Sequence, residues 1–272
     1  MLASWNIANL GVHIRKPRDY RLMAELLSWF DIACIQEVND DLSGLRAIEE
    51  AMGGTYRVLF SDKAGNNERM AVIYDSAKLR PGELAAEIAV PAADKRHIRI
   101  DGIAGPFLGF DRNPHVLSLD VGTTRLTLVN VHLYFGGSST DRRVLEAYAV
   151  GRWADLRAKS GNAYGDVVYA VGDFNIPKVG PGDAIYRALT KRGLRLPIHS
   201  GRIASAIATD NQYDQIAFTP GAARQALLGT DVFDYDGAVF AKVWKERTKA
   251  EFRGYLRYYM SDHRPVWAEI AV

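Results

Sequence analysis

The chain has 272 residues, of which 48% are hydrophobic and 10% aromatic, so it is long enough to bury a full core. Its net charge of +2 excludes the strong global field that marks many nucleic-acid or membrane-surface proteins. The single cysteine, Cys34, excludes an intrachain disulfide and a cysteine-based metal cluster, and its apolar neighbours predict a buried thiol. No long apolar run or leader pattern is found, so we expect a cytoplasmic protein without a membrane partner.

Short apolar runs of strand length recur along the chain and predict its strands. They lie at residues 2–8, 31–38, 56–60, 69–75, 115–121, 125–135, 167–174, 213–218 and 265–272. Apolar residues at helical spacing predict helices over residues 19–30 and 140–158. The short Gly-Thr-Thr link between the fifth and sixth runs predicts a hairpin, so the sheets should be mixed or largely antiparallel. Without a long linker, we expect one α/β domain over residues 1–272.

Carboxylate, amide and imidazole side chains gather at the ends of these runs. They are Asn6, Glu37, His132, Asp173, Asn175, Asp214, Asp262 and His263. Each alone has an ordinary explanation as a turn former, a core histidine or a surface charge. Together they form the inventory of a hydrolytic site with a hard metal ion. Mg²⁺ needs only one or two protein carboxylates beside waters and a substrate phosphate, and Glu37 and Asp262 fit that need.

Six stretches also carry a family resemblance. They read WNIANLG, IQEV, NVHL, GDFNIP, YDQIAF and SDHRPV, in this order from residue 5 to residue 266. The set resembles the endonuclease/exonuclease/phosphatase superfamily, and NERMAVIYD and DRNPHVLSL are similar to its pancreatic-type deoxyribonucleases. The resemblance implies a four-layer α/β sandwich, with two mixed, largely antiparallel sheets face to face and helices outside. It also implies cleavage of phosphoester bonds that depends on Mg²⁺ or Mn²⁺.

The resemblance implies roles for the residues that would hold the metal ion and the phosphate. Glu37 would bind the divalent cation with help from Asn6 and Asp262. Asp173 and Asn175 would orient the attacking water and the scissile phosphate. A phosphodiester needs such groups because negative charge spreads over its non-bridging oxygens while a poor alkoxide leaves.

The resemblance also implies two imidazoles, each supported by a carboxylate. His263 would have Asp214 behind it, and His132 would have Glu68 behind it. A carboxylate in this position fixes the tautomer of the ring and favours its protonated form. Arg112 resembles the family arginine that lies near the phosphate. Which imidazole is the acid and which is the base is left open.

The positions that grip duplex DNA in pancreatic-type enzymes are different in this chain. Ala8, Asn39 and Asn66 stand where those enzymes have two arginines and a tyrosine, and the family disulfides are missing too. The sequence therefore predicts that the catalytic residues of those enzymes are kept, whereas the residues that bind duplex DNA are lost or replaced by others.

One segment, residues 242–257, is strongly basic, with six Lys or Arg against two Glu. It is either a solvated helix face or a substrate-binding surface formed by Lys245, Lys249, Arg253 and Arg257. The tyrosines at 255, 258 and 259 either stack on bases or pack into the core, and we expect core packing.

We therefore expect a metal-dependent nuclease whose partner is nucleic acid, with DNA the favoured substrate and no obligate protein partner inferred. The alternative is a phosphatase or a lipid or inositol phosphodiesterase on the same fold. A catalytically inactive binding module is a minor alternative, because every motif position holds a competent residue type. The chain has no Gly-x-Ser-x-Gly elbow, phosphate loop or His-Glu-x-x-His helix, and these absences argue against other hydrolase chemistries.

Overall fold

The computed structural model describes residues 1–11, 18–136, 140–160, 162, 165, 167–197 and 203–272. Two sheets face each other, one in the order β10-β11-β1-β2-β4-β3 and one in the order β5-β6-β7-β8-β9. The strands are β1 Leu2–Leu10, β2 Ile32–Val38, β3 Tyr56–Phe60, β4 Arg69–Asp75, β5 Arg80–Glu87, β6 His115–Val121, β7 Thr124–His132, β8 Val167–Asp173, β9 Asp214–Phe218, β10 Leu227–Val232 and β11 Val266–Ile270. Only the pairs β1–β2 and β7–β8 are parallel in the described sheets.

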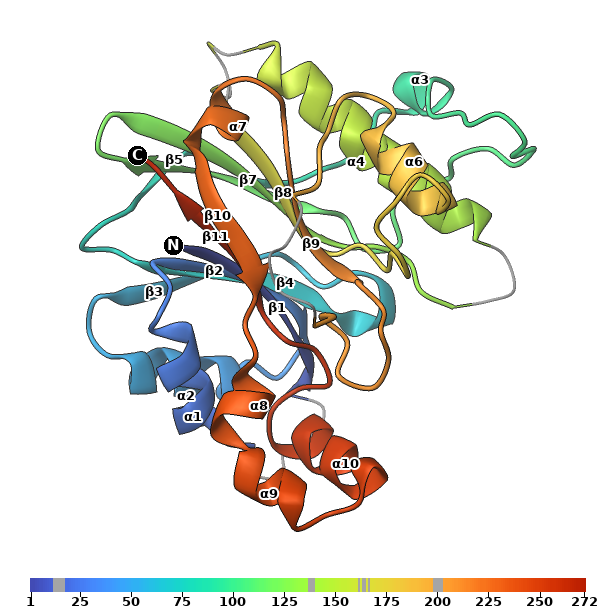
Figure 1. Ribbon diagram of the computed structural model, residues 1–272. Helices are drawn as coiled ribbons and strands as arrows, with labels where there is room; N and C mark the ends of the chain where they lie inside the picture. Colours follow the sequence, from blue (N-terminus) through green and yellow to red (C-terminus); the bar gives the residue numbers. More distant parts are fainter. Residues whose placement is uncertain (12–17, 137–139, 161, 163–164, 166, 198–202) are drawn as a thin grey trace.

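Helices cover the outer faces of both sheets (Figure 1). They are α1 Tyr20–Leu27, α2 Ser43–Met52, α3 Ala92–Lys95, α4 Asp141–Ala158, α6 Ala184–Thr190, α7 Ala222–Ala226, α8 Tyr235–Val239, α9 Ala241–Lys245 and α10 Lys249–Tyr259, with a 3₁₀ turn, η1, at Gly65–Asn67. Helices α4 and α6 pack on the five-stranded sheet, whereas α1, α2, α8 and α10 pack on the six-stranded sheet. A third apolar layer, which includes the buried Cys34, fills the space between the sheets.

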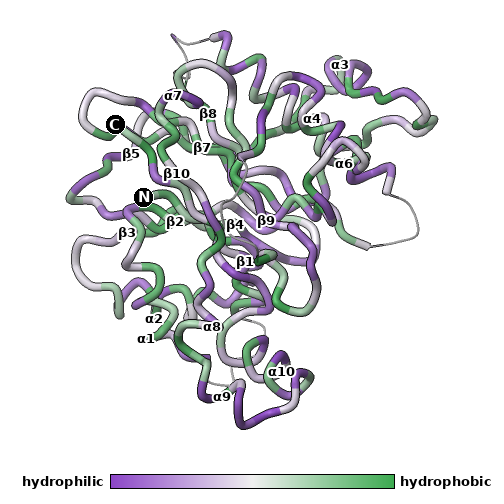
Figure 2. Tube along the Cα trace, viewed as in Figure 1, coloured by the Kyte–Doolittle hydropathy of each residue, from purple (hydrophilic) through white to green (hydrophobic). Residues whose placement is uncertain are grey.

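This architecture confirms the predicted four-layer sandwich of two mixed, largely antiparallel sheets. The nine predicted strands and the β6–β7 hairpin are present. Two strands at sheet edges, β5 and β10, were not predicted. The sixth run was predicted to continue to residue 135, but β7 ends at His132, and the next residue, Leu133, donates its backbone N–H to Asp173 O at 2.9 Å. Figure 2 shows hydrophobic residues along the central strands and hydrophilic stretches around α9 and α10.

The alternation of side chains along the strands determines where the polar residues lie. On β7, Leu126 and Leu128 belong to the layer between the sheets, whereas Val129 and Val131 face α4. His132 therefore ends the series that points between the sheets. Three more polar residues point between the sheets because they lie an even number of positions from interlayer residues of their own strand. They are Asp173 on β8, with Val167, Tyr169 and Val171; Asp214 on β9, with Ile216 and Phe218; and Asn6 on β1, with Leu2. The apolar interlayer thus becomes polar at one end of the sandwich.

Candidate active site

Glu37 reaches this polar end because β2 contains a bulge. Up to Ile35, β2 pairs regularly with β4. Ile35 then pairs with Ala71 and Val38 with Arg69, so β2 has one residue more than β4 between these two pairs. Glu37 occupies that irregular stretch with a φ of 60°, in the left-handed region that non-glycine residues rarely adopt. Regular alternation would turn its side chain away from the interlayer, whereas the bulge directs it towards Asn6.

Asn6 joins the two carboxylates that lie nearest to it. Its Nδ2 donates to Glu37 Oε1 at 2.8 Å and to Asp173 Oδ2 at 3.0 Å. Its Oδ1 accepts a hydrogen bond from the backbone N–H of Ala8 at 3.0 Å. The amide thus presents its nitrogen to the carboxylates. The predicted role of Asn6 beside the metal ion stays a prediction, and the structure places the side chain next to Glu37, the predicted ligand.

His132 lies directly beside these groups and has Glu68 behind it, as the sequence predicted. Its Nδ1 is 2.9 Å from Glu68 Oε2, and its Nε2 is 3.9 Å from Glu37 Oε1 and 3.8 Å from Asp173 Oδ2. Arg112 Nε donates to the same Glu68 oxygen at 2.6 Å. Burial acts to raise the pKa of Glu68, but His132 and Arg112 outweigh burial and lower this pKa. Arg112 is buried and acts here as a support for Glu68.

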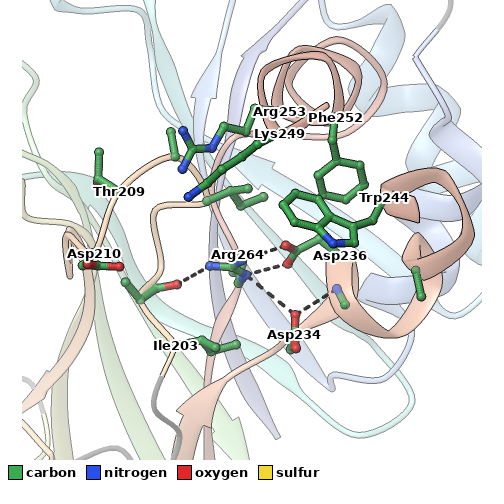
Figure 3. A pocket seen from close by; sticks show the side chains of 15 residues that line it. Ile203, Thr209, Asp210, Asp234, Asp236, Trp244, Lys249, Phe252, Arg253 and Arg264 are labelled. Carbon is green, nitrogen blue, oxygen red and sulfur yellow. Dashed lines mark hydrogen bonds and ion pairs between the residues drawn. The ribbon is translucent and has the colours of Figure 1, made fainter. Parts of the chain in front are cut away.

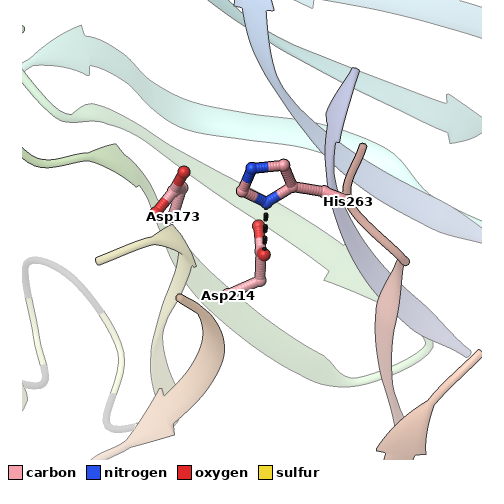
Figure 4. Close-up of side chains that lie close together, drawn as sticks. All are labelled: Asp173, Asp214 and His263. Carbon is pink, nitrogen blue, oxygen red and sulfur yellow. Dashed lines mark hydrogen bonds and ion pairs between the residues drawn. The ribbon is translucent and has the colours of Figure 1, made fainter. Parts of the chain in front are cut away.

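The second imidazole, His263, pairs with Asp214 on the neighbouring side of the site (Figure 4). His263 Nδ1 is 2.7 Å from Asp214 Oδ2, and Asp214 is fully buried. Burial disfavours the imidazolium, yet Asp214, with Asp173 and Asp262, raises the pKa of His263. Burial also raises the pKa of Asp214. The pair therefore retains a proton at neutral pH.

Asp173 lies between the two imidazoles and completes a compact cluster. One ligand atom from each of Asp173, Asp214 and His263 lies within 4.8 Å of the others. Asp173 Oδ1 accepts from the backbone of Asn175, and the Asn175 side chain donates to Leu133 O at 2.9 Å. Asn175 thus holds the loop after β8 in place, with a φ of 53°.

The segment before β11 is tied to β1 through Ser261. The Ser261 hydroxyl donates to Asn6 O at 2.6 Å and accepts from the backbone N–H of His263 at 3.0 Å. Both hydrogen bonds of this buried hydroxyl go to the backbone, so Ser261 has a structural role. Next to it, Asp262 is partly exposed, and its Oδ2 is 3.4 Å from Arg257 Nε.

Arg18 is a site neighbour that the sequence analysis missed. Its guanidinium is buried and donates to Ala8 O at 2.7 Å and to Ile7 O at 2.6 Å. These bonds hold a left-handed turn at Ala8 and Asn9, whose φ angles are 54° and 56°. This turn also positions the backbone N–H of Asn9, which donates to Glu37 Oε2 at 2.9 Å. No local pattern around residue 18 signals this contact, since it depends on tertiary structure.

The basic segment divides between two helices. Lys249, Arg253 and Arg257 follow one another at intervals of four on α10, and Arg257 reaches Asp262. Lys245 ends the separate helix α9 and is exposed. Two of the three tyrosines, Tyr255 and Tyr259, pack partly against the core of the six-stranded sheet, which agrees with the core packing expected for them.

Two aromatic rings lie close to the site. The ring centroid of Tyr213 is 6.1 Å from that of His263 and 6.2 Å from that of Phe135. Phe135 is 58% exposed, although it is a large apolar side chain. An exposed ring in this position offers a surface on which a planar group can stack.

Comparisons with known proteins agree with this fold. No family model matches the chain. A deoxyribonuclease from Thioalkalivibrio sp. is 29% identical over 226 residues, which cover 79% of this chain and 56% of that protein. The chain therefore spans about half the length of this curated relative. A solved endonuclease/exonuclease/phosphatase family protein from Bacteroides thetaiotaomicron has a TM-score of 0.60 at 19% identity, covering 99% of this chain and 93% of its own.

A second solved structure, the 3′ phosphatase NExo from Neisseria bound to a product DNA hairpin, has a TM-score of 0.57 at 18% identity. The match covers 100% of this chain and 99% of that one. The chain thus has the endonuclease/exonuclease/phosphatase fold, and the resemblance of its motifs to that superfamily is confirmed. Among the described residues, no helix is both long and apolar enough to span a bilayer.

Proposed function

We propose that the protein is a metal-dependent phosphodiesterase that hydrolyses nucleic acid, with DNA as the favoured substrate. The observation that carries the proposal is the convergence of two imidazole–carboxylate pairs on Asp173 at one end of the sandwich. His132 Nε2 lies 3.8 Å from Asp173, and His263 belongs to the same compact cluster. Similarity to a curated deoxyribonuclease supports the choice of substrate.

The carboxylates next to Asn6 suit a divalent cation. Glu37 Oε1 and Asp173 Oδ2 accept hydrogen bonds from the same nitrogen of Asn6 and flank the same nitrogen of His132. Mg²⁺ and Mn²⁺ prefer such oxygen ligands, so Glu37 and Asp173 would hold the ion, with Asp262 at the edge of the site. The bound ion would neutralise charge that develops on the phosphate oxygens.

The two histidines have different surroundings, which suggests different tasks. His263 Nδ1 bonds buried Asp214, which favours the imidazolium, so His263 is suited to donate a proton from its other ring nitrogen, Nε2, to a substrate oxygen. His132 directs Nε2 towards Glu37 and Asp173 while Glu68 lies at Nδ1. Glu68 thereby fixes the orientation of the ring, and Arg112 fixes Glu68. Asp173, held by Asn6 and Asn175, orients the attacking water.

The nature of the substrate is supported by the surroundings of the site. Phe135 and Tyr213 offer a stacking surface beside His263, which suits a nucleobase better than a small sugar or inositol phosphate. A phosphatase acting on the end of a DNA strand is the second candidate, because the Neisseria relative on this fold is a 3′ phosphatase bound to DNA.

A substrate panel tests the proposal. Plasmid, linear duplex, single-stranded DNA, RNA and 3′-phosphorylated oligonucleotides are incubated with the protein and Mg²⁺, Mn²⁺ or EDTA. We expect internal or terminal phosphodiester cleavage that requires the metal ion. Release of inorganic phosphate alone would support the phosphatase instead, and no metal-dependent product from any nucleic acid would refute both.

A further inference from the structure

A cleft of about 530 Å³ lies beside the site, outside the groups described so far (Figure 3). Residues 203–210 form one wall, and α8, α9 and α10 form the others. The cleft adjoins the catalytic segment directly, because Ala206 pairs with His263 and the backbone N–H of Ile207 donates to Asp262 O at 2.9 Å. Its volume lies in the range of small-ligand sites.

Two cations in the cleft are available to a ligand. Lys249 and Arg253 both line it from α10, and neither has an acidic partner among the described residues. The third cation, Arg264, is different, because it is neutralised by Asp236 through contacts of 2.5 and 2.7 Å. A phosphate would therefore meet the uncompensated charge of the α10 wall.

An aromatic ring stands next to these cations. Trp244 lines the cleft and is 45% exposed, while its ring is held edge-to-face against buried Phe252 at a centroid distance of 4.9 Å. A fixed, exposed indole next to paired cations is the combination that single-stranded nucleic acids use for stacking and phosphate contact. Asp210 faces α10 from the opposite wall and offers an acceptor to the N–H groups of a base (Figure 3).

The row of cations also connects the cleft to the site. Arg257 follows Arg253 by one helical interval and reaches Asp262. Residues four apart on a helix are separated by about 6 Å along its axis, so Lys249 and Arg257 are about 12 Å apart along α10.

We infer that this cleft, here named the α10 cleft, binds one unpaired nucleotide of the substrate strand next to the scissile phosphate. Its base would stack on Trp244 and its phosphate would contact Lys249 and Arg253. The inference rests on the proposed nuclease function and adds that the enzyme holds a single strand or a frayed end. Such a subsite also explains how the chain can bind DNA without the residues that grip a duplex in pancreatic-type enzymes.

Binding in EDTA tests the inference separately from catalysis. The probes are a fluorescein-labelled single-stranded oligonucleotide and a blunt hairpin of the same composition, followed by anisotropy over a range of salt concentrations. We expect Trp244→Ala to weaken single-strand binding by about 5- to 100-fold and to leave hairpin binding nearly unchanged. The double variant Lys249→Gln/Arg253→Gln should lower the salt slope for the single strand by about 0.7, the value for the one phosphate that both cations contact.

The matched control is Lys242→Gln/Arg224→Gln, which removes the same charge from exposed positions outside the cleft. It should keep the wild-type salt slope. If the control and the cleft variant lowered the slope equally, or if Trp244→Ala bound the single strand like wild type, the α10 cleft would not be a nucleotide site. Cleavage by those same variants at the wild-type rate would then leave the nuclease proposal standing. A wild-type protein that neither binds nor cuts any nucleic acid would overturn both.

Discussion

Replacing Arg18 by Met should destabilise the protein and loosen the entry to the site. The methionine keeps an apolar stem but cannot donate to the backbone oxygens of Ile7 and Ala8, which accept from Arg18 at 2.6 and 2.7 Å. A buried acceptor left without its partner costs about 1–3 kcal/mol, so two of them give a loss of about 2–6 kcal/mol in the free energy of unfolding. Arg18→Lys should recover part of this loss, since an ammonium still offers donors.

The same reasoning predicts a coupling between Arg18 and Ala8. The φ of 54° at Ala8 is strained for any residue with a Cβ, so Ala8→Gly should stabilise the wild-type protein by up to about 1 kcal/mol. Without the Arg18 contacts the turn can relax, and the gain from glycine should shrink. Urea denaturation of both single variants and the double variant measures this coupling. An unchanged unfolding midpoint in Arg18→Met, or strict additivity in the cycle, would refute the role of Arg18 as a clamp on this turn.

Three further predictions follow from individual side chains. Burial lowers the pKa of His115 to about 4. As the pH falls below 6.5, the histidine is therefore protonated in the unfolded chain before it is protonated in the folded protein. The free energy of unfolding should fall by about 3 kcal/mol down to pH 4. His115→Gln should flatten that decline in a series of urea titrations, and an unchanged pH profile would contradict it. Glu37→Gln should weaken Mn²⁺ binding in calorimetry, since a charged oxygen ligand becomes neutral; wild-type affinity would exclude Glu37 as a ligand. His263→Ala should lower the turnover number by about two to four orders of magnitude while Mn²⁺ affinity changes little, and wild-type turnover would remove His263 from the proton transfers.

The elements that the sequence predicted are those with a clear local pattern. Buried central strands such as β7 and β8 are near-continuous apolar runs, and a polar residue at the end of such a run was recognisable as a site candidate. His132 and Asp173 were found in this way, and the register of β7 and β8 places them side by side. The edge strand β5 contains Pro81 and Gly82 and is largely exposed, so it lacks the apolar pattern that identifies a strand.

Other features depend on tertiary contacts that a single sequence does not display. The bulge at Glu37 reverses the direction that regular alternation predicts for its side chain. The hydrogen bonds of Arg18 to Ile7 and Ala8 have no local sequence pattern, and Trp244 becomes part of a cleft only when α9 and α10 fold together. A local signal does exist at the start of α10, where Thr248 and Glu251 form a capping box.

The central claim is that water cleaves a phosphodiester of nucleic acid at this site with the help of a divalent ion. Cleavage of an end-labelled oligonucleotide in water enriched in oxygen-18, with Mg²⁺ or Mn²⁺ added to metal-free protein, tests it most directly. Mass spectrometry of the fragments should show one heavy oxygen in each newly formed terminal phosphate, only when metal is present, and none with Asp173→Asn. Intact oligonucleotide under every metal condition, or heavy oxygen only in released inorganic phosphate, would contradict the claim.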